Sequence, residues 1–250
     1  MKVDENIIIT QTDPKSPVSE AYRVLRTNIQ YSGLDKPFKS IVITSAGAME
    51  GKTTTIVNLA ITFAQTGNRV LIIDADLRRP KVHKVFNLTN EQGLTNYLAS
   101  QGELKTYINH NLVLPNLDVL TSGTIPPNPS EMLNSKTMKR FIDIAGSLYD
   151  IILIDSPPVG SVTDASIIST YVDGTILVVK SGKSEINAVK RAKEALEKVH
   201  ANIIGVVLND LDKKAIGNKY DYRYYYTDES VKKNFWKKLW EKIERLQATK

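Results

Sequence analysis

Short apolar runs rich in Val and Ile alternate along the chain with longer amphipathic stretches. The runs are Ser40–Thr44, Arg69–Asp74, Leu117–Thr121, Tyr149–Asp155, Gly174–Val179 and Ile203–Leu208. An unbroken apolar run indicates a strand that is buried on both faces, and strands of this kind with helical connections form a parallel sheet. The pattern therefore predicts an α/β fold with a doubly wound, mostly parallel sheet.

Helices are predicted in the gaps between these strands, where the apolar period changes from continuous to 3.6 residues. They cover Lys52–Thr66, a segment that begins after Ser130, and Glu185–His200. Ahead of the first strand, Ser16 as N-cap and Pro17 in the first turn predict a separate helix through about Tyr31. Because this helix precedes the core, we interpret it as an arm that is free to make other contacts.

The length of 250 residues suits one large α/β domain with appendages. We divide the chain into an N-terminal arm, 1–39, a core, 40–212, and a tail, 213–250. The tail begins with the polar, Tyr-rich segment Lys213–Ser230, which we interpret as mobile. A basic amphipathic helix is predicted behind it, because six apolar residues fall on one face of a helical wheel. These residues are Phe235, Trp236, Leu239, Trp240, Ile243 and Leu246.

Composition limits the classes of function. The chain has no cysteine, which excludes disulfides and thiolate metal sites. The N-terminus does not resemble a secretion signal, and no apolar stretch reaches the length of about 18 residues that a membrane helix needs. These features predict a cytoplasmic protein.

The net charge of +6 is concentrated at one end of the chain. Residues 1–212 hold 22 Lys and Arg against 22 Asp and Glu, which leaves 11 against 5 for residues 213–250. A neutral body with a basic tail differs from the basic surface that nucleic acid requires. We therefore expect no nucleic-acid partner.

A phosphate-binding loop, residues 46–54, joins the first predicted strand to the helix that follows. Backbone N–H groups in such a loop point at phosphate oxygens, Lys52 reaches the β and γ phosphates, and the Thr53 hydroxyl is a ligand for Mg²⁺. The pattern's first Gly is replaced by Ala46, a tolerated variant. An ordinary strand-to-helix turn is the alternative, and the flanking elements disfavour it. The predicted nucleotide-binding residues are Gly47, Ala48, Met49, Glu50, Gly51, Lys52, Thr53 and Thr54.

Three acids follow apolar runs, where the carboxyl ends of parallel strands meet. Asp74 and Asp76 end one run and Asp155 ends another. Two acids one residue apart repel each other when buried, and a cation relieves the conflict. Ion pairs with Arg78 or Arg79 are the alternative for the first two, and a turn or N-cap role is the alternative for Asp155.

The last predicted core strand is followed by Asn209. Its amide offers a paired donor and acceptor that suit the edge of a purine base. A turn-forming role is an equal alternative.

These motifs resemble those of bacterial tyrosine kinases, which are P-loop NTPases of the deviant Walker (MinD/ParA-like) class. The phosphate loop, Asp74-Ala75-Asp76-Leu77-Arg78 and Asp155-Ser156-Pro157-Pro158 are similar to their Walker A, A′ and B motifs. The resemblance spans residues 16 to about 226. It implies ATP and Mg²⁺ as cofactors, Thr53, Asp76 and Asp155 around the metal, and a role in exopolysaccharide or capsule synthesis.

The resemblance also implies partners. Glu20, Arg23 and Arg26 are similar to a signature through which these kinases form homo-oligomeric rings, although a solvated charged face is the alternative reading of their spacing. A transmembrane activator of the polysaccharide co-polymerase type, protein substrates and a tyrosine phosphatase are further expected partners. The activator would recruit the chain to the inner face of the cell membrane.

Five of the eleven tyrosines lie within seven residues of the tail, among charged neighbours that do not suit a buried aromatic cluster. By resemblance they are phosphoacceptors that a neighbouring copy modifies in trans. They are Tyr220, Tyr222, Tyr224, Tyr225 and Tyr226.

The catalytic residues predicted from the motifs are Lys52, Asp74, Asp76 and Asp155. Lys52, the loop N–H groups and Mg²⁺ would neutralise transition-state charge. A tyrosine hydroxyl has a pKa of about 10, so a carboxylate base assists its attack. The resemblance leaves Asp74 and Asp76 as candidates, and we favour Asp74.

Two other functions stay open. A ParA/MinD-like positioning ATPase shares the fold and would use the helix over 235–246 to contact a membrane surface or a protein. Such ATPases carry Lys at the second loop position, where this chain has Gly47, and they give the tyrosines no role. A metabolic P-loop enzyme is the third possibility and leaves the tyrosines equally unexplained.

Overall fold

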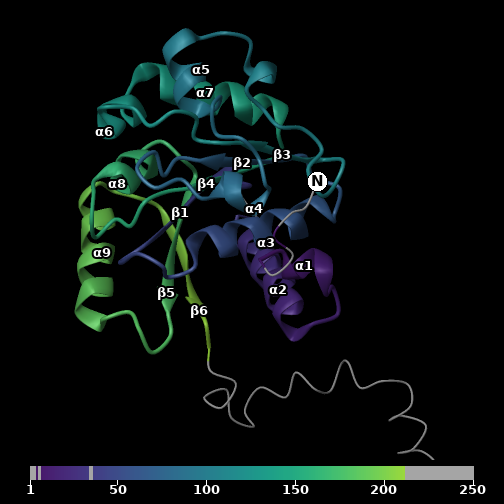
Figure 1. Ribbon diagram of the computed structural model, residues 1–250. Coiled ribbons are helices and arrows are strands. Elements are labelled where there is room, and N and C mark those ends of the chain that lie inside the picture. The colour runs from purple at the N-terminus through teal and green to yellow at the C-terminus, as the bar shows by residue number, and fades with distance from the viewer. Residues whose placement is uncertain (1–3, 5–6, 34–35, 212–250) are drawn as a thin grey trace, which may run out of the picture. The chain divides into compact units, whose positions relative to one another are not determined.

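The computed structural model describes residues 4, 7–33 and 36–211, which form the first of two compact units along the chain. Within these residues, six strands pair in parallel in the order β3-β2-β4-β1-β5-β6 (Figure 1). They are β1 Ser40–Ser45, β2 Val70–Asp74, β3 Leu117–Leu120, β4 Ile151–Asp155, β5 Gly174–Lys180 and β6 Ile203–Asn209. The parallel, doubly wound sheet and each predicted strand are confirmed, with ends shifted by one or two residues.

The strand order places the ends of three strands together. The chain leaves β1, crosses to β2 and later returns to insert β4 between them. In the resulting register Ile43 pairs with Asp155, and Asp74 pairs with Asp155. The carboxyl ends of β1, β2 and β4 therefore form one edge, where ligands bind in open α/β sheets.

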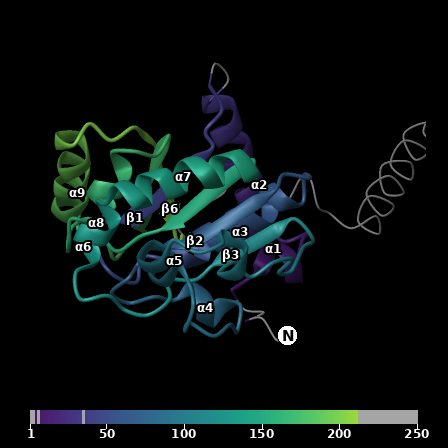
Figure 2. The ribbon, with the colours of Figure 1, turned by 90° about the horizontal axis from the view of Figure 1, so that it is seen from above.

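Helices cover both faces of the sheet (Figures 1 and 2). On one face, α3 (Lys52–Ala64) packs with α1 (Ile9–Thr12) and α2 (Pro17–Ser32) against Ile41, Ile72 and Leu153. On the other face, α7 (Lys136–Leu148) packs against alternate residues of the same strands, including Leu71 and Ile152. The remaining helices are α4 (Val82–Val85), α5 (Leu94–Ser100), η1 (Leu104–Thr106), α6 (Pro129–Leu133), α8 (Asp164–Ser169) and α9 (Ile186–Lys198).

The segment predicted to be one helix after Ser130 consists of two helices, and the first begins earlier than predicted. α6 starts at Pro129, whose fixed φ suits a first helical position. A new N-cap follows, because the Ser135 side chain accepts a hydrogen bond from the Met138 N–H at 3.1 Å. The prediction missed this cap, which starts α7.

The last strand departs from the predicted burial on both faces. β6 lies at the edge of the sheet, and Val206 and Leu208 are 61% and 52% exposed. The helix α9 packs over the neighbouring strand, where its buried Leu196 clusters with Leu177. An unbroken apolar run therefore did not guarantee a covered strand.

The described part of the predicted arm is packed on the core instead of standing apart. Ile8 and Ile29 belong to the same apolar cluster as α3. The fully buried Asn58 of α3 holds this segment: its Oδ1 accepts from the Thr10 N–H at 3.0 Å and from the Thr10 hydroxyl at 2.9 Å, and its Nδ2 donates to the Ile7 carbonyl at 2.6 Å. The predicted N-cap is confirmed, since Ser16 accepts from the Ser19 N–H at 3.2 Å.

None of the helices in the described ranges has the length and apolar character needed to cross a bilayer.

We predict that Asn58→Ala destabilises the protein by about 2–3 kcal/mol, because the buried Thr10 and the carbonyl of the partly buried Ile7 lose their hydrogen-bond partner. Urea unfolding followed by circular dichroism would measure the change. Asn28→Ala on the exposed side of α2 is the matched control and should alter stability by less than about 0.5 kcal/mol. Equal effects of the two substitutions would contradict this account of the packing.

Candidate functional site

The phosphate loop is locked by the end of β6. Gly51 has φ +97°, and a Cβ atom there would meet Asn209 Nδ2 at 1.9 Å. The Asn209 Nδ2 donates to the Glu50 carbonyl at 3.0 Å. Only glycine fits this contact, because both the backbone angle and the space require it. Asn209 therefore holds the loop through its side-chain N–H group, the donor that the sequence presents as a candidate for contact with a purine base.

A second wall of the loop is the connection between β5 and α9. The Glu50 side chain is 7% exposed, and its Oε1 accepts from the Ser184 hydroxyl at 2.5 Å. Ser184 in turn accepts from the Lys180 N–H at 2.8 Å. These contacts fix the loop from outside the motif.

Lys52 begins α3 and turns back over the loop. Its side chain is almost buried, and Nζ donates to Ser45 Oγ at 3.0 Å, while Ser45 Oγ donates to the Gly47 carbonyl at 2.6 Å. Burial lowers the pKa of the Lys52 ammonium, and the nearby carboxylate of Asp155 opposes that shift. The cation is thus held at the carboxyl end of β1.

Thr53 and Asp155 form the contact that a metal site would use. The Thr53 hydroxyl donates to Asp155 Oδ2 at 2.6 Å. The second oxygen, Oδ1, is buried without a hydrogen-bond partner among the described residues. Burial raises the pKa of Asp155 to about 6, against the lowering effects of the Thr53 hydrogen bond and of Lys52.

This donor set fits a hard divalent cation. Hydroxyl and carboxylate oxygens are the ligands that Mg²⁺ prefers, and an unpartnered buried oxygen gains from a cation nearby. No group of three His, Cys, Asp or Glu side chains gathers as a metal site in the described part of the chain. Mg²⁺ commonly takes one or two protein carboxylates and completes its shell with phosphate and water, so the pair is sufficient.

Asp74 is engaged by backbone groups. It is fully buried, its Oδ1 accepts from the Asp76 N–H at 3.2 Å, and its Oδ2 accepts from the N–H groups of Lys81 and Val82 at 3.0 Å each. Burial and the charge of Asp155 raise its pKa well above the ordinary value, although the hydrogen bonds oppose this. The carboxylate therefore organises residues 75–81, which we name the β2 turn.

Asp76 is the more accessible of the two acids. It is partly exposed, and its Oδ1 accepts from the Arg79 N–H at 3.0 Å. The alternative role of this acid, an ion pair with Arg78 or Arg79, is not formed among the described residues: the Arg78 guanidinium donates two hydrogen bonds to the buried Asp164, at 2.8 and 3.1 Å, and Arg79 contributes only its backbone N–H. That bidentate pair ties the β2 turn to the start of α8.

A pocket of about 600 Å³ lies beside the phosphate loop. Its walls come from the phosphate loop, the ends of β5 and β6, α4 with the residue before it, and the N-terminal segment. Lysines are prominent among the lining side chains, which suits a ligand with phosphates. They are Lys52, Lys81, Lys84 and Lys180. Sequence reasoning missed the last three, because no spacing rule connects them to the loop.

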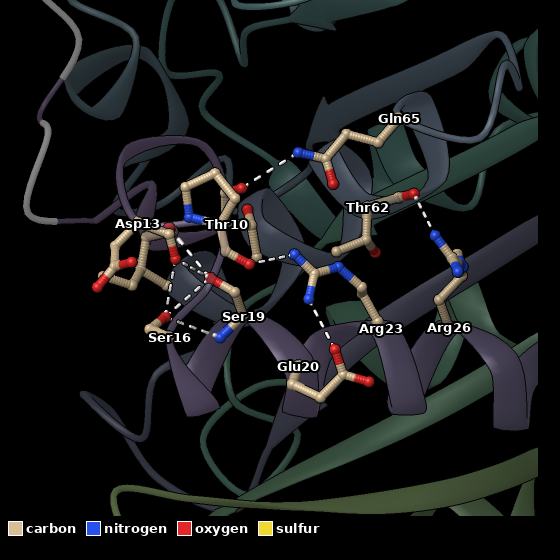
Figure 3. Close-up of polar contacts among 11 residues, drawn as sticks. Thr10, Asp13, Ser16, Ser19, Glu20, Arg23, Arg26, Thr62 and Gln65 are labelled. Atoms are coloured by element: carbon tan, nitrogen blue, oxygen red, sulfur yellow. Dashed lines mark hydrogen bonds and ion pairs between the residues drawn. The ribbon is translucent and has the colours of Figure 1, made fainter. Parts of the chain in front are cut away.

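Three residues of the arm lie on one side of α2 and contact their own chain (Figure 3). Arg23 pairs with Glu20 at 2.7 Å and also donates to the Pro14 carbonyl. Arg26 donates to the Thr62 carbonyl of α3 at 2.8 Å. Its Nε is buried without a hydrogen-bond partner in the described ranges. The tyrosines at 220–226 and the segment 235–246 lie outside the described residues.

Comparison with known proteins gives consistent matches. A family model described as ParA: NUBPL iron-transfer P-loop NTPase matches residues 38–234. Tyrosine-protein kinase YwqD of Bacillus subtilis is 44% identical over 223 residues, covering 89% of this chain and 92% of the relative. Tyrosine-protein kinase CpsD of Streptococcus agalactiae is 39% identical, covering 82% and 89%.

Solved structures agree with these sequence matches. The chimerical protein CapA2B2 superposes with a TM-score of 0.80 at 40% identity, covering 83% of this chain and 91% of that one. The kinase domain of Escherichia coli tyrosine kinase ETK gives 0.79 at 35%, covering 87% and 84%. A Pyrococcus horikoshii septum site-determining protein MinD, with a TM-score of 0.58 at 24% identity, shares the fold.

We predict that Asp155→Asn stabilises the protein at pH 8 when nucleotide and metal are absent. Because the pKa of Asp155 is higher in the folded protein than in the unfolded chain, its ionised form destabilises the folded protein at pH values above about 6. Below pH 4 the carboxyl group is protonated in both states, and this destabilisation disappears. The expected gain is about 1–3 kcal/mol at pH 8 and near zero at pH 4. Thermal unfolding in EDTA at both pH values measures it.

Asp150→Asn is the control of opposite sign. Hydrogen bonds from Arg69 lower the pKa of the exposed Asp150, so removing its charge should lower stability at pH 8. A loss of stability in Asp155→Asn at pH 8 would contradict the electrostatic description of the site.

Proposed function

The chain belongs to the bacterial tyrosine-protein kinases, and we propose that it transfers the γ-phosphoryl group of Mg-ATP to tyrosine hydroxyls. The observation that carries this proposal is the hydrogen bond from the Thr53 hydroxyl to Asp155 at the lysine-lined pocket that Thr53 borders, because the second oxygen of Asp155 is buried without a partner among the described residues. The five tyrosines of residues 220–226 are the proposed acceptors, modified by a neighbouring copy.

We assign the phosphates to the phosphate loop, Gly47 to Thr54. Its backbone N–H groups and the first turn of α3 would bind the phosphate oxygens, with Lys52 on the β and γ groups. Thr53 and Asp155 would hold Mg²⁺, directly or through water. The metal would supply neutralisation of phosphate charge. Asn209, at the pocket wall, remains our candidate for contact with the base through its Oδ1.

In the transfer itself, the tyrosine oxygen forms a bond to the γ-phosphorus while the bond from that phosphorus to the β–γ bridging oxygen breaks and ADP leaves. The tyrosine proton passes to a carboxylate. Of the two candidates from the sequence, Asp76 is partly exposed, whereas Asp74 is buried and both its oxygens accept backbone hydrogen bonds. We therefore propose Asp76 as the base and Asp74 as the organiser of the β2 turn.

We further propose that the chain acts as a homo-oligomeric ring, with Glu20, Arg23 and Arg26 at its interface, in the regulation of exopolysaccharide or capsule synthesis. Related chains named as tyrosine-protein kinases support the activity. A transmembrane activator, a tyrosine phosphatase and a membrane surface met by 235–246 are the proposed partners.

A positioning ATPase is not favoured. The similarity to MinD, at 24% identity, supports only a shared fold. The relatives that are 39–44% identical to this chain are named as tyrosine-protein kinases.

We predict that Lys52→Met abolishes phosphorylation of the tail while leaving the fold intact, because its positive charge acts on phosphates. Mass spectrometry after incubation with Mg-ATP should find several phosphates on peptides covering 220–226 in the wild type and none in the variant. Lys190→Met on exposed α9 is the control and should remain active. Phosphate release without any phosphotyrosine in the wild type would indicate an ATPase instead.

A further inference from the structure

The phosphate loop of this chain has Gly47 where positioning ATPases of the same fold carry a second lysine. In the structure, a lysine from outside the loop, Lys81, lines the same pocket as Lys52. We propose that Lys81, at the end of the β2 turn, is a second cation on the γ-phosphoryl group and that Asp74 positions it. The inference builds on the proposed phosphoryl transfer and adds a residue to it.

The place of Lys81 in the pocket supports this role. It lines the same cavity as Lys52 and Thr53, on the side formed by the start of α4. Its charge lowers the pKa of both Lys52 and Asp155, although burial is the larger influence on each. The charge of Lys81 therefore acts on the same two side chains that the proposed phosphoryl transfer uses.

The backbone of Lys81 is held although its side chain is exposed. The buried Asp74 accepts from the N–H groups of Lys81 and Val82 at 3.0 Å, and the register of β2 with β4 places Asp74 beside Asp155. The Arg78 fork onto Asp164 anchors the middle of the same turn. The point from which the Lys81 side chain extends is therefore fixed beside the carboxyl ends of β2 and β4.

The other lysines of the pocket are less suited to this position. Lys180 pairs with Asp210 at 3.1 Å on the wall formed by β5 and β6. Lys84 lies three residues further along the chain, within α4, and its charge adds to burial in lowering the pKa of the adjacent His83. Lys81 is therefore the lysine of α4 that best complements Lys52.

Charge at the reacting group explains the need for a second cation. The transferred phosphoryl group spreads negative charge over its oxygens, and cations placed there accelerate transfer in P-loop enzymes. A contact to the γ group distinguishes ATP from ADP, whereas a lysine that only supports the fold does not. This difference provides a readout that is independent of catalysis.

The test uses the full chain and its variants Lys81→Met, Lys81→Arg and Arg79→Met, the last removing one charge from the same turn outside the pocket. Calorimetry measures binding of Mg-AMPPNP and Mg-ADP, and rapid quench measures tail phosphorylation. We expect Lys81→Met to weaken Mg-AMPPNP about tenfold and Mg-ADP less than twofold, and to slow transfer about 10²-fold. Lys81→Arg should restore most of both, and Arg79→Met should behave as wild type.

Equal losses for the two nucleotides would overturn the proposal. Unchanged binding of both with a raised KM for an acidic tyrosine peptide would also overturn it, because Lys81 would then contact the acceptor. If the wild type forms no phosphotyrosine, the proposed function fails, but the ratio of the two affinities still tests Lys81. Asp74→Asn should lower that ratio and add little to Lys81→Met, as coupled residues do.

Discussion

Two buried carboxylates meet at the carboxyl edge of the sheet, and the surrounding structure is arranged around their repulsion. Asp74 and Asp155 are paired by the register of β2 and β4, and each is at most 2% exposed. Two such groups cannot both be charged in a dry environment without compensating donors or cations. The two carboxylates differ in the hydrogen-bond donors that compensate their burial. Asp74 receives three backbone N–H groups, whereas Asp155 receives one hydroxyl and keeps an oxygen without a partner.

This asymmetry separates structure from chemistry. A carboxylate saturated by backbone donors is fixed and shapes the loop around it, so Asp74 determines where the β2 turn runs and where α4 starts. A carboxylate with unused capacity is costly in the free protein and gains from a bound cation. Asp155 is of the second kind, and its partner Thr53 lies in the first turn of α3. The free-energy cost of burying the Asp155 carboxylate therefore arises at a site where a bound cation can remove it.

The sequence predicted those parts of the molecule that depend on local pattern. Apolar runs located the strands, Ser16 located the cap of α2, and the acids at the strand ends followed from the carboxyl edge of a parallel sheet. Contacts between distant segments were not predictable. Asn209 seated on Gly51, and Asn58 bound to Thr10, each join residues at least 48 positions apart. The exposure of β6 depends on strand order, which periodicity does not encode.

One helix connects the phosphate loop to the arm. The first turn of α3 carries Lys52 and Thr53, its middle carries Asn58, which binds the arm, and its last turns offer the Thr62 carbonyl to Arg26 (Figure 3). A cation at the C-terminal end of a helix is favourable because the helix dipole is negative there. Arg26 thus stabilises the same helix whose positive end faces the phosphates. A surface that binds Arg26 from outside would compete with the Thr62 carbonyl for this guanidinium. Contacts at the arm and the position of the phosphate loop therefore both depend on α3.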